Sequence, residues 1–357
     1  MSPDLIMRPA LRPAHAAHRP TTSPLIRAPK PNDIPFGQTA ADDLDTRRAR
    51  EETDLMKTLL YALAGAVALT GWAGAQERLS FDDPEDVLIM NRKMGCSTVD
   101  GEAVTYYWNG YAYSRRAGER DRRLFRVEGM NTRACVTLEH PEYGTGYKLV
   151  SRELLLYLDP ETNEILSTWD NPWTGETVDV LHVANDPVNF GPNWANGPRG
   201  PATFRGQIQG DDWWQTITVP LWYPNPLASE FEAEIGGTYH ATEMFNYFGS
   251  VEDLTDPTRT TADTEVGWVR QSDWLPWMRM NGRDGVIYFH TAGTKLDSFD
   301  ELPEFFIEEI DRHYPEYRTP PPLDDDRENV TSWIYYRDAA NCEIEVPDRG
   351  GEGFDCD

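Results

Sequence analysis

Long apolar segments are scarce in this sequence of 357 residues. Apart from residues 59–72 (LLYALAGAVALTGW), no segment approaches the roughly 20 apolar residues that a membrane-spanning helix needs. That one segment is too short and too rich in glycine to span a bilayer. We therefore expect the folded part of the chain to be soluble, without a membrane span.

Basic residues are also scarce, since 33 Lys and Arg stand against 60 Asp and Glu and give a net charge of −27. After residue 75 the only lysines are Lys93, Lys148 and Lys295. Such an excess of negative charge repels nucleic acids and anionic membranes, so we expect neither as a partner. Two explanations stay open: solubility in a salty medium outside the cytoplasm, or an acidic face for a cationic partner.

The signatures of the common enzyme classes are missing. The sequence has no Gly-x-Ser-x-Gly nucleophile elbow, no phosphate-binding glycine loop, no dinucleotide fingerprint and no His-Glu-x-x-His motif. No spacing of its cysteines or histidines resembles a zinc site or a haem attachment site. These absences disfavour the common hydrolases, kinases and dehydrogenases, and we expect no cofactor and no metal.

Residues 56–75 have the three parts of a secretory signal peptide. A positive start (MKT) is followed by the apolar segment and by Ala73-Gly74-Ala75, a small-residue cleavage site. Because an export signal stands at the N-terminus, we expect translation to start at Met56 and cleavage to follow Ala75. The alternative is that residues 1–55 form a disordered extension before a signal anchor.

The expected mature chain begins at residue 76 and contains all the cysteines. We expect one domain over residues 76–338 and an acidic tail over residues 339–357. An even number of cysteines in an oxidising compartment favours disulfides over metal ligation, and three pairings are possible. Sequence proximity suggests Cys96 with Cys135 and Cys342 with Cys356, which would tether the tail. We expect a periplasmic or secreted protein.

The pattern of the expected domain is that of a β protein. Helices are predicted only at residues 83–92 and 298–313, and residues 186–201 look too irregular for a β-ladder and form a candidate rim or lid. We predict a mainly β fold, an antiparallel barrel or strongly curved sheet (calycin-like) with a few peripheral helices. Runs rich in β-branched and aromatic residues predict strands at 103–114, 124–128, 134–138, 148–158, 164–169, 176–184, 203–209, 212–221, 237–248, 265–272, 285–296 and 331–337.

Six motifs resemble a family of exported bacterial proteins, domain-of-unknown-function family 1838. The resemblance spans about residues 86–336, leaves out the residues upstream of the expected signal, and supplies no reaction. The motifs are residues 128–131 (EGMN), 152–160 (RELLLYLDP), 171–175 (NPWTG), 182–189 (HVANDPVN), 223–226 (YPNP) and 274–278 (WLPWM).

The same motifs hold most of the candidate ligand-binding residues. Their aromatic side chains are expected either to line a broad apolar cavity or to fill the interior and close the ends of a barrel. The polar residues after residue 184 either point at a ligand or cap a strand. The candidate ligand-binding residues are Asn131, Trp169, Trp173, Asn185, Asp186, Tyr223, Trp274, Trp277, Met278 and His290.

The candidate catalytic residues are His182, His240, Glu243 and Tyr239. Either histidine could serve as a general base near neutral pH. The alternative for each is a core histidine whose hydrogen bonds are satisfied. On a strand His240 and Glu243 point to opposite faces, so no metal pair is expected. Burial beside aromatic residues would raise the pKa of Glu243 and let it transfer protons, unless it pairs with Arg270 or Arg279.

Three functions remain. The first is a carrier that binds a small hydrophobic or aromatic molecule in a tryptophan-lined cavity. The second is a cofactor-independent lyase, isomerase or hydrolase that acts on such a molecule through His182, His240 or Glu243. The third is a structural envelope protein without a cavity. Convergence of those three side chains on one pocket favours the enzyme, and their dispersal favours the carrier.

Overall fold

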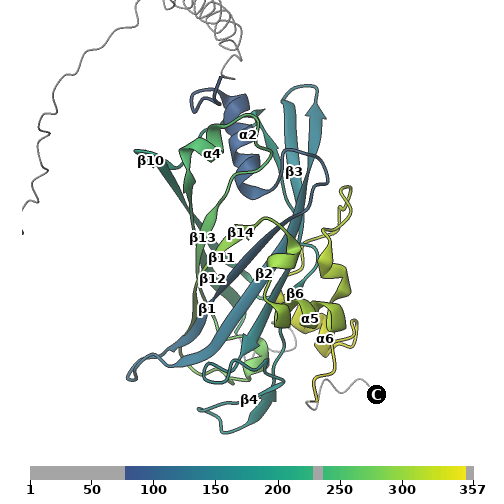
Figure 1. Cartoon of the computed structure of the whole chain (residues 1–357). Coiled ribbons are helices and arrows are strands. Elements are labelled where there is room, and N and C mark those ends of the chain that lie inside the picture. Colours follow the sequence, from purple (N-terminus) through teal and green to yellow (C-terminus); the bar gives the residue numbers. More distant parts are fainter. Residues whose placement is uncertain (1–76, 228–235, 351–357) are drawn as a thin grey trace, which may run out of the picture. The chain divides into compact units, whose positions relative to one another are not determined.

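The computed structural model describes residues 77–227 and 236–350 (Figure 1). The expected signal peptide, the residues before it and Cys356 lie outside the described residues. The chain divides into Met1–Gly74 and Ala75–Asp357, and the second unit holds every described residue. Within the described ranges, no helix is both long enough and apolar enough to cross a bilayer.

One large antiparallel sheet dominates the second unit, which confirms the mainly β prediction. Its strand order is β10-β11-β12-β13-β14-β1-β2-β3-β6, with β7 also paired to β3. The strands are β1 (Val104–Arg115), β2 (Arg123–His140), β3 (Gly144–Leu158), β6 (Val183–Asn185), β7 (Phe190–Trp194), β10 (Gln207–Gln209), β11 (Asp212–Pro224), β12 (Thr238–Ser250), β13 (Glu265–Ser272) and β14 (Val286–Leu296). Two small hairpins pair β4 (Thr168–Asp170) with β5 (Thr177–Asp179) and β8 (Asn196–Gly197) with β9 (Gly200–Pro201).

The sheet is twisted and curved, but the closed barrel is not confirmed (Figure 1). Among the described residues, no pairing joins β6 at one end of the strand order to β10 at the other. Helix α6 (Ser332–Ala340) contacts β6 instead, and its fully buried Trp333 meets Tyr239 of β12 with ring centroids 4.8 Å apart. A helix thus packs on the inner side of the sheet where a barrel would need strands.

Helix α5 (Glu304–His313) defines the outer face of the sheet. Its buried Phe306 and Ile310 pack with Met130 of β2 and Leu154 of β3. The short 3-10 turns η2 (Phe299–Glu301) and η3 (Pro315–Arg318) flank it. Because side chains alternate along a strand, the neighbours of Met130 and Leu154 in the sequence point to the opposite, inner face.

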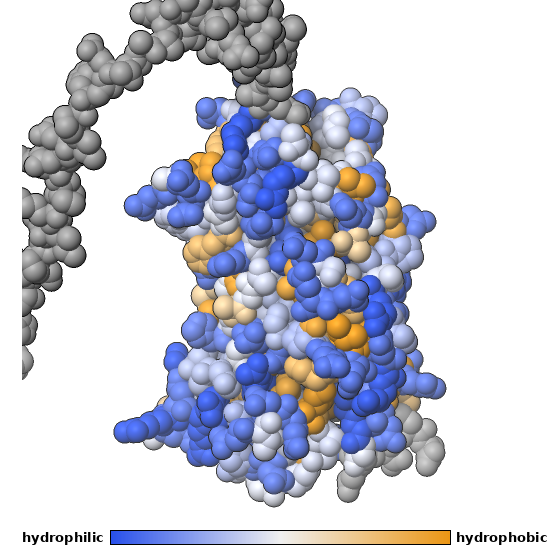
Figure 2. Space-filling model, viewed as in Figure 1, coloured by the Kyte–Doolittle hydropathy of each residue, from blue (hydrophilic) through white to orange (hydrophobic). Residues whose placement is uncertain are grey.

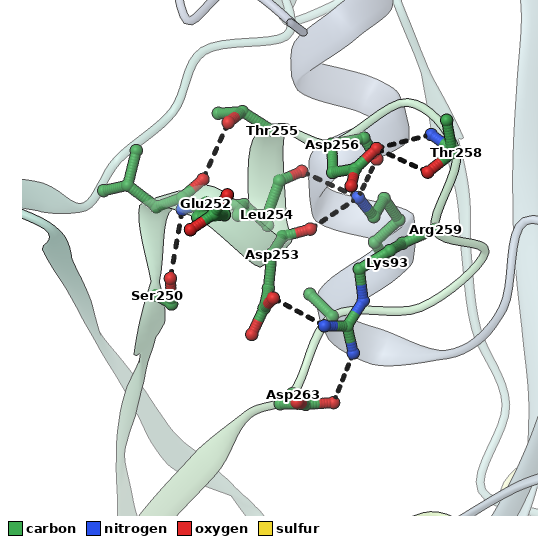
Figure 3. A network of polar contacts seen from close by, with 12 residues as sticks. Lys93, Ser250, Glu252, Asp253, Leu254, Thr255, Asp256, Thr258, Arg259 and Asp263 are labelled. Carbon is green, nitrogen blue, oxygen red and sulfur yellow. Dashed lines mark hydrogen bonds and ion pairs between the residues drawn. The ribbon is translucent and has the colours of Figure 1, made fainter. Parts of the chain in front are cut away.

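Helices α2 (Pro84–Gly95) and α4 (Val251–Thr255) lie together at one end of the sheet (Figure 1). Asp83 caps α2 by accepting from the backbone N–H groups of Glu85 and Asp86, as expected for a helix that starts with proline. Lys93 of α2 donates to the backbone carbonyls of Asp253, Leu254 and Asp256, so its ammonium closes the C-terminal end of α4 (Figure 3).

A disulfide joins Cys96, directly after α2, to Cys135 of β2, with a Cα–Cα distance of 6.0 Å. This is the first of the two expected pairs. The second expected pair includes Cys356, which lies outside the described residues, and it stays a prediction.

Several local predictions are wrong or only partly right: the predicted strands 164–169 and 203–209 shorten to β4 and β10, and the helix predicted from residue 298 starts at Glu304. Residues 331–337 belong to α6 rather than to a strand, because Thr331 caps a helix whose buried Trp333, Tyr336 and Ala339 recur every three residues. The predicted strand at residues 176–184 is broken into β5 and β6. Residues 186–201 are not free of ladder structure, since β7 pairs with β3 in that range.

Figure 2 shows a mostly hydrophilic face with separate hydrophobic patches. The most exposed of the large apolar side chains is Trp222 on β11, at 78%. Scattered apolar residues of this kind are normal on a protein surface and define no site by themselves.

Candidate functional site

A small cavity lies on the inner face of the sheet, between side chains of β1, β2, β3, β12 and β13. About 70 Å³ of it is open to the centre of a water molecule, which is room for a few waters or one small ligand. Aromatic rings form half of its wall, and four polar side chains form most of the rest. The lining residues are Tyr106, Trp108, Asn131, Arg133, Glu153, Glu243, Phe245, Tyr247, Val266 and Trp268.

Strand register explains why distant residues meet here. Tyr106 on β1 pairs with Asn131 on β2, Asn131 pairs with Glu153 on β3, and Glu153 pairs with Asn185 on β6. Directly opposed residues of an antiparallel sheet have side chains on the same face. One row of side chains on the inner face therefore crosses four neighbouring strands, and Tyr106, Asn131 and Glu153 of this row line the cavity.

Two glycines make room for Trp108 in the wall. Gly129 on β2 and Gly293 on β14 are its cross-strand partners on either side. A Cβ atom on Gly129 would lie 2.4 Å from the indole, and one on Gly293 would lie 2.6 Å from Trp108 Cα. The indole thus covers a neighbour that has no side chain, and it meets Trp268 edge-on with ring centroids 6.4 Å apart.

Glu243 belongs to an ion pair within the wall of the cavity. Its carboxylate lies 3.5 Å from the Arg270 guanidinium, and both side chains are mostly buried. Arg270 also donates to the hydroxyl of the buried Tyr239, at 2.5 Å. Glu243 and Tyr239, two of the catalytic candidates, therefore meet at one arginine, and the pairing of Glu243 with Arg270 is the structural alternative expected above.

Arg133, the cation that lines the cavity, is held by its own strand and by α2. Its Nε donates to Asn131 Oδ1 at 2.9 Å, and a terminal nitrogen donates to the Gly95 carbonyl at 3.3 Å. The guanidinium lies 4.6 Å from the centroid of the Tyr106 ring. The partners of the Arg133 guanidinium are therefore neutral groups: an amide oxygen, a backbone carbonyl and an aromatic ring.

Glu153 is the exception among the charged groups of the cavity. Within the described ranges no hydrogen bond or ion pair reaches its carboxyl group, although the positive charges of Arg270 and Arg133 act on it from a distance. Burial, with repulsion from Glu243 as the next cause, raises the pKa of Glu153 from 4.5 to about 7. Near neutral pH this carboxyl group exchanges its proton readily.

Asn185 is the neighbour of Glu153 on β6 and is 8% exposed. Its Oδ1 atom is buried and has no hydrogen-bond partner among the described residues. A buried polar atom without a partner costs free energy, and Asn185 carries such an atom next to Glu153, although Asn185 does not itself line the cavity.

The candidate tryptophans pack on one another. Trp169 and Trp173 meet edge-on at 6.3 Å, and Trp277 lies 6.2 Å from Trp169. Trp274 packs on Trp173 at 5.3 Å and donates from its indole to the Arg283 carbonyl. With the fully buried Met278, they belong to the main hydrophobic core and do not line the cavity described above.

The histidine candidates are dispersed. His182 is buried, accepts the Tyr157 backbone N–H at 3.0 Å, and stays neutral because burial lowers its pKa well below the ordinary value. His240 and His290 are exposed on the outer face. None of the three lines the cavity, whereas Glu243 does.

Two further candidates have local partners. Asp186 pairs with Arg152 at 3.0 Å and with Arg327 at 2.8 Å. These ion pairs join the end of β6 to β3 and to the segment before α6. Tyr223 packs its ring 5.0 Å from that of Tyr239. Neither residue lines the cavity.

Sequence reasoning missed several of the lining residues, above all Glu153, Arg133, Trp108 and Trp268. Glu153 lies inside one of the family motifs, and Trp108 lies in the predicted strand 103–114. Strand alternation predicts which residues of one strand share a face. It does not predict which strands are neighbours in the sheet.

Carboxylates and imidazoles do not gather into a metal site in the part of the chain that the structure describes. No group of three or more His, Cys, Asp or Glu residues there is arranged to hold a metal ion.

Comparison with known proteins gives a family and no activity. No curated protein matches the chain. The profile of a family described as "Protein of unknown function (DUF1838)" matches residues 101–340, more than half of the chain and all the strands that line the cavity. The chain therefore belongs to this family, as the six sequence motifs indicated.

Proposed function

We propose that this protein binds a small molecule with an aromatic or similarly flat apolar part in the inner-face cavity. The observation that carries the proposal is a cavity walled by five aromatic side chains and closed by a few polar ones, the usual composition of a ligand site. In this proposal the curved sheet serves as an open, calycin-like cup. The envelope reading, which needs no cavity, has less support.

Dispersal of the histidines favours binding over the histidine-dependent enzyme. His182 is locked as a neutral acceptor in the core, and His240 lies on the far face of its strand. The only catalytic candidate that lines the cavity is Glu243, and Arg270 already neutralises it. This is the outcome expected for a carrier.

A second candidate function rests on Glu153. A carboxyl group with a pKa of about 7 is a competent general acid or base near neutral pH, which suits a cofactor-independent lyase, isomerase or hydrolase. Chemical conversion of a bound molecule, lost in a Glu153→Gln variant, would support it. A ligand that leaves the protein unchanged would contradict it.

The proposal includes a location outside the cytoplasm. The disulfide between Cys96 and Cys135 supports an oxidising location, and the expected signal supports export to the periplasm or beyond. N-terminal sequencing of the protein from its own cell tests this. We expect a start at Gln76, and a peptide from before Met56 would contradict the expected translation start.

Binding is tested with a variant that fills the cavity. Val266 lines it from β13, so Val266→Phe should place a ring in the available space. The control is Val269→Phe, on the opposite face of the same strand. We expect saturation transfer by NMR from the protein to at least one of phenol, benzyl alcohol, benzylamine or benzoate, abolished by the first variant only. No transfer to any of them, together with an empty protein in native mass spectrometry, would contradict the proposal.

A further inference from the structure

The charges and rings of the cavity indicate the chemical class of its ligand. We propose that the ligand is a small protonated amine, whose ammonium group binds between the Glu153 carboxylate and the aromatic wall. This inference rests on the proposed binding function and makes it specific.

The first step is the charge balance around the cavity. Two carboxyl groups line it, and the one on Glu243 has a cationic partner in Arg270. The other, on Glu153, has no ion pair among the described residues. Arg133 does not supply one, because its donors face Asn131 and the Gly95 carbonyl. The missing counter-charge at Glu153 is positive.

The second step is the chemistry of the wall. Aromatic faces are electronegative and attract cations that lie within about 6 Å of the ring centroid. Tyr106 already has two such cations, Arg133 at 4.6 Å and Lys295 at 5.6 Å. Trp108 and Trp268 line the same wall, and the indole is the ring type that attracts cations most strongly.

The third step separates an amine from other cations and from anions. The Glu153 carboxylate lines the cavity as an acceptor without a donor among the described residues, and an ammonium N–H would donate to it. A metal ion would need more oxygen ligands than two carboxyl groups provide, and rings do not replace them. An anion would meet two carboxyl groups at the wall.

Proton linkage follows from the groups that face Glu153. These are Glu243 from β12, Arg270 from β13, Arg133 from β2 and Tyr157 on its own strand. Only the ionised carboxylate pairs with an ammonium ion, so amine binding displaces the proton of Glu153. Below the pKa of about 7, affinity should fall about tenfold per pH unit.

The experiment is a calorimetric titration of the full chain at pH 8 with three probes of similar shape, benzylammonium, benzyl alcohol and benzoate. We expect benzylammonium to bind at least about tenfold more tightly than benzyl alcohol, with benzoate weakest. Repeating the titration at pH 6 should weaken benzylammonium binding about tenfold and leave benzyl alcohol unchanged.

Variants localise the effect. Glu153→Gln should lower the affinity for benzylammonium at pH 8 by on the order of tenfold and remove its pH dependence, while binding of benzyl alcohol persists. The control Glu265→Gln changes the net charge equally but lies on the exposed outer face of β13, so it should leave both properties as in the wild type. The wild-type pH series tests the inference even if Glu153→Gln fails to fold.

Two results would overturn the inference and leave the binding function standing: equal affinities for benzylammonium and benzyl alcohol, or tighter binding of benzoate. Binding of calcium ions at the site, with no binding of benzylammonium, would also overturn it. If none of the three aromatic probes binds, the proposed function fails together with the inference.

Discussion

The two lysines at the end of the sheet and the carboxyl group in its cavity are ionisable groups whose pKa values burial shifts, but their hydrogen-bond partners differ. Lys93 Nζ donates to three backbone carbonyls, and Lys295 Nζ donates to two carbonyls and the Thr261 hydroxyl (Figure 3 shows the first set). Each ammonium group thus uses all of its donors. Glu153 has no such partner among the described residues.

The difference separates ionisable groups that hold the fold together, the two lysines, from one whose hydrogen-bonding capacity is unused, Glu153. Burial lowers the pKa of Lys93 only to about 8, so the ammonium form with its three donors persists at neutral pH and joins α2 to α4. Burial raises the pKa of Glu153 to about 7 with no hydrogen bond in return. A fold keeps an unsatisfied buried group at a cost in stability, which points to a role in binding.

The largest expected effect comes from breaking the lysine network. Lys93→Met removes the donor for three carbonyls at the end of α4, and should lower the free energy of unfolding by about 4 kcal/mol. Urea denaturation measures it. The matched control is Lys148→Met, which removes a lysine with one carbonyl contact, to Asp325 at 3.2 Å, and should cost less than about 1 kcal/mol. Similar losses for both would mean that Lys93 has no special role.

Glu153→Gln should behave in the opposite way and stabilise the protein at alkaline pH. The raised pKa of Glu153 favours folding below about pH 4.5, and this contribution is lost as the pH rises through about 7. A glutamine never ionises, so the variant should match the wild type at pH 5 and exceed it by about 2 kcal/mol at pH 9. Thermal denaturation across this range checks the sign, and a variant less stable at pH 9 than at pH 5, relative to wild type, would contradict it.

A smaller effect should follow from crowding the aromatic wall. Gly129→Ala places a methyl group against the Trp108 indole and should cost about 1.5 kcal/mol while it displaces the ring. Gly267→Ala on β13 is the control, because its nearest contacts would be at ordinary distances from 3.8 Å. Fluorescence and denaturation of both variants test this. No difference between them would show that Trp108 does not need its glycine neighbour.

The smallest effect is expected from the two asparagines that flank Glu153. Asn185→Leu removes an oxygen that has no partner, so stability should change by less than about 0.5 kcal/mol. Asn131→Leu removes the acceptor of Arg133 and should cost about 1 kcal/mol. A clear loss of stability on replacement of Asn185 would assign it a structural partner.

Local pattern predicted most of the fold. β-branched and aromatic alternation located the long strands, and the Asp-Pro start located α2, because both signals are encoded by adjacent residues. Residues 331–337 were misassigned because Trp, Ile and Tyr favour strands as readily as a buried helix face, and only the packing of Trp333 on Tyr239 decides between them.

The site was harder to predict because it depends on strand order. Glu243 and Asn131 were identified, and they line the same cavity. Glu153 was not, since nothing within β3 reveals that β12 and β13 bring a second carboxyl group and three aromatic rings to the same cavity. The tryptophan motifs were predicted to bind a ligand because tryptophan side chains are large and aromatic. Such side chains are as typical of the hydrophobic core as of a ligand site.

The most direct test is the titration of the Glu153 carboxyl carbon by ¹³C NMR, in the free protein and in protein saturated with benzylammonium. The account predicts a pKa near 7 in the free protein, and a fall of at least about one unit when the amine is bound. A pKa near 4.5 that does not respond to benzylammonium would contradict it.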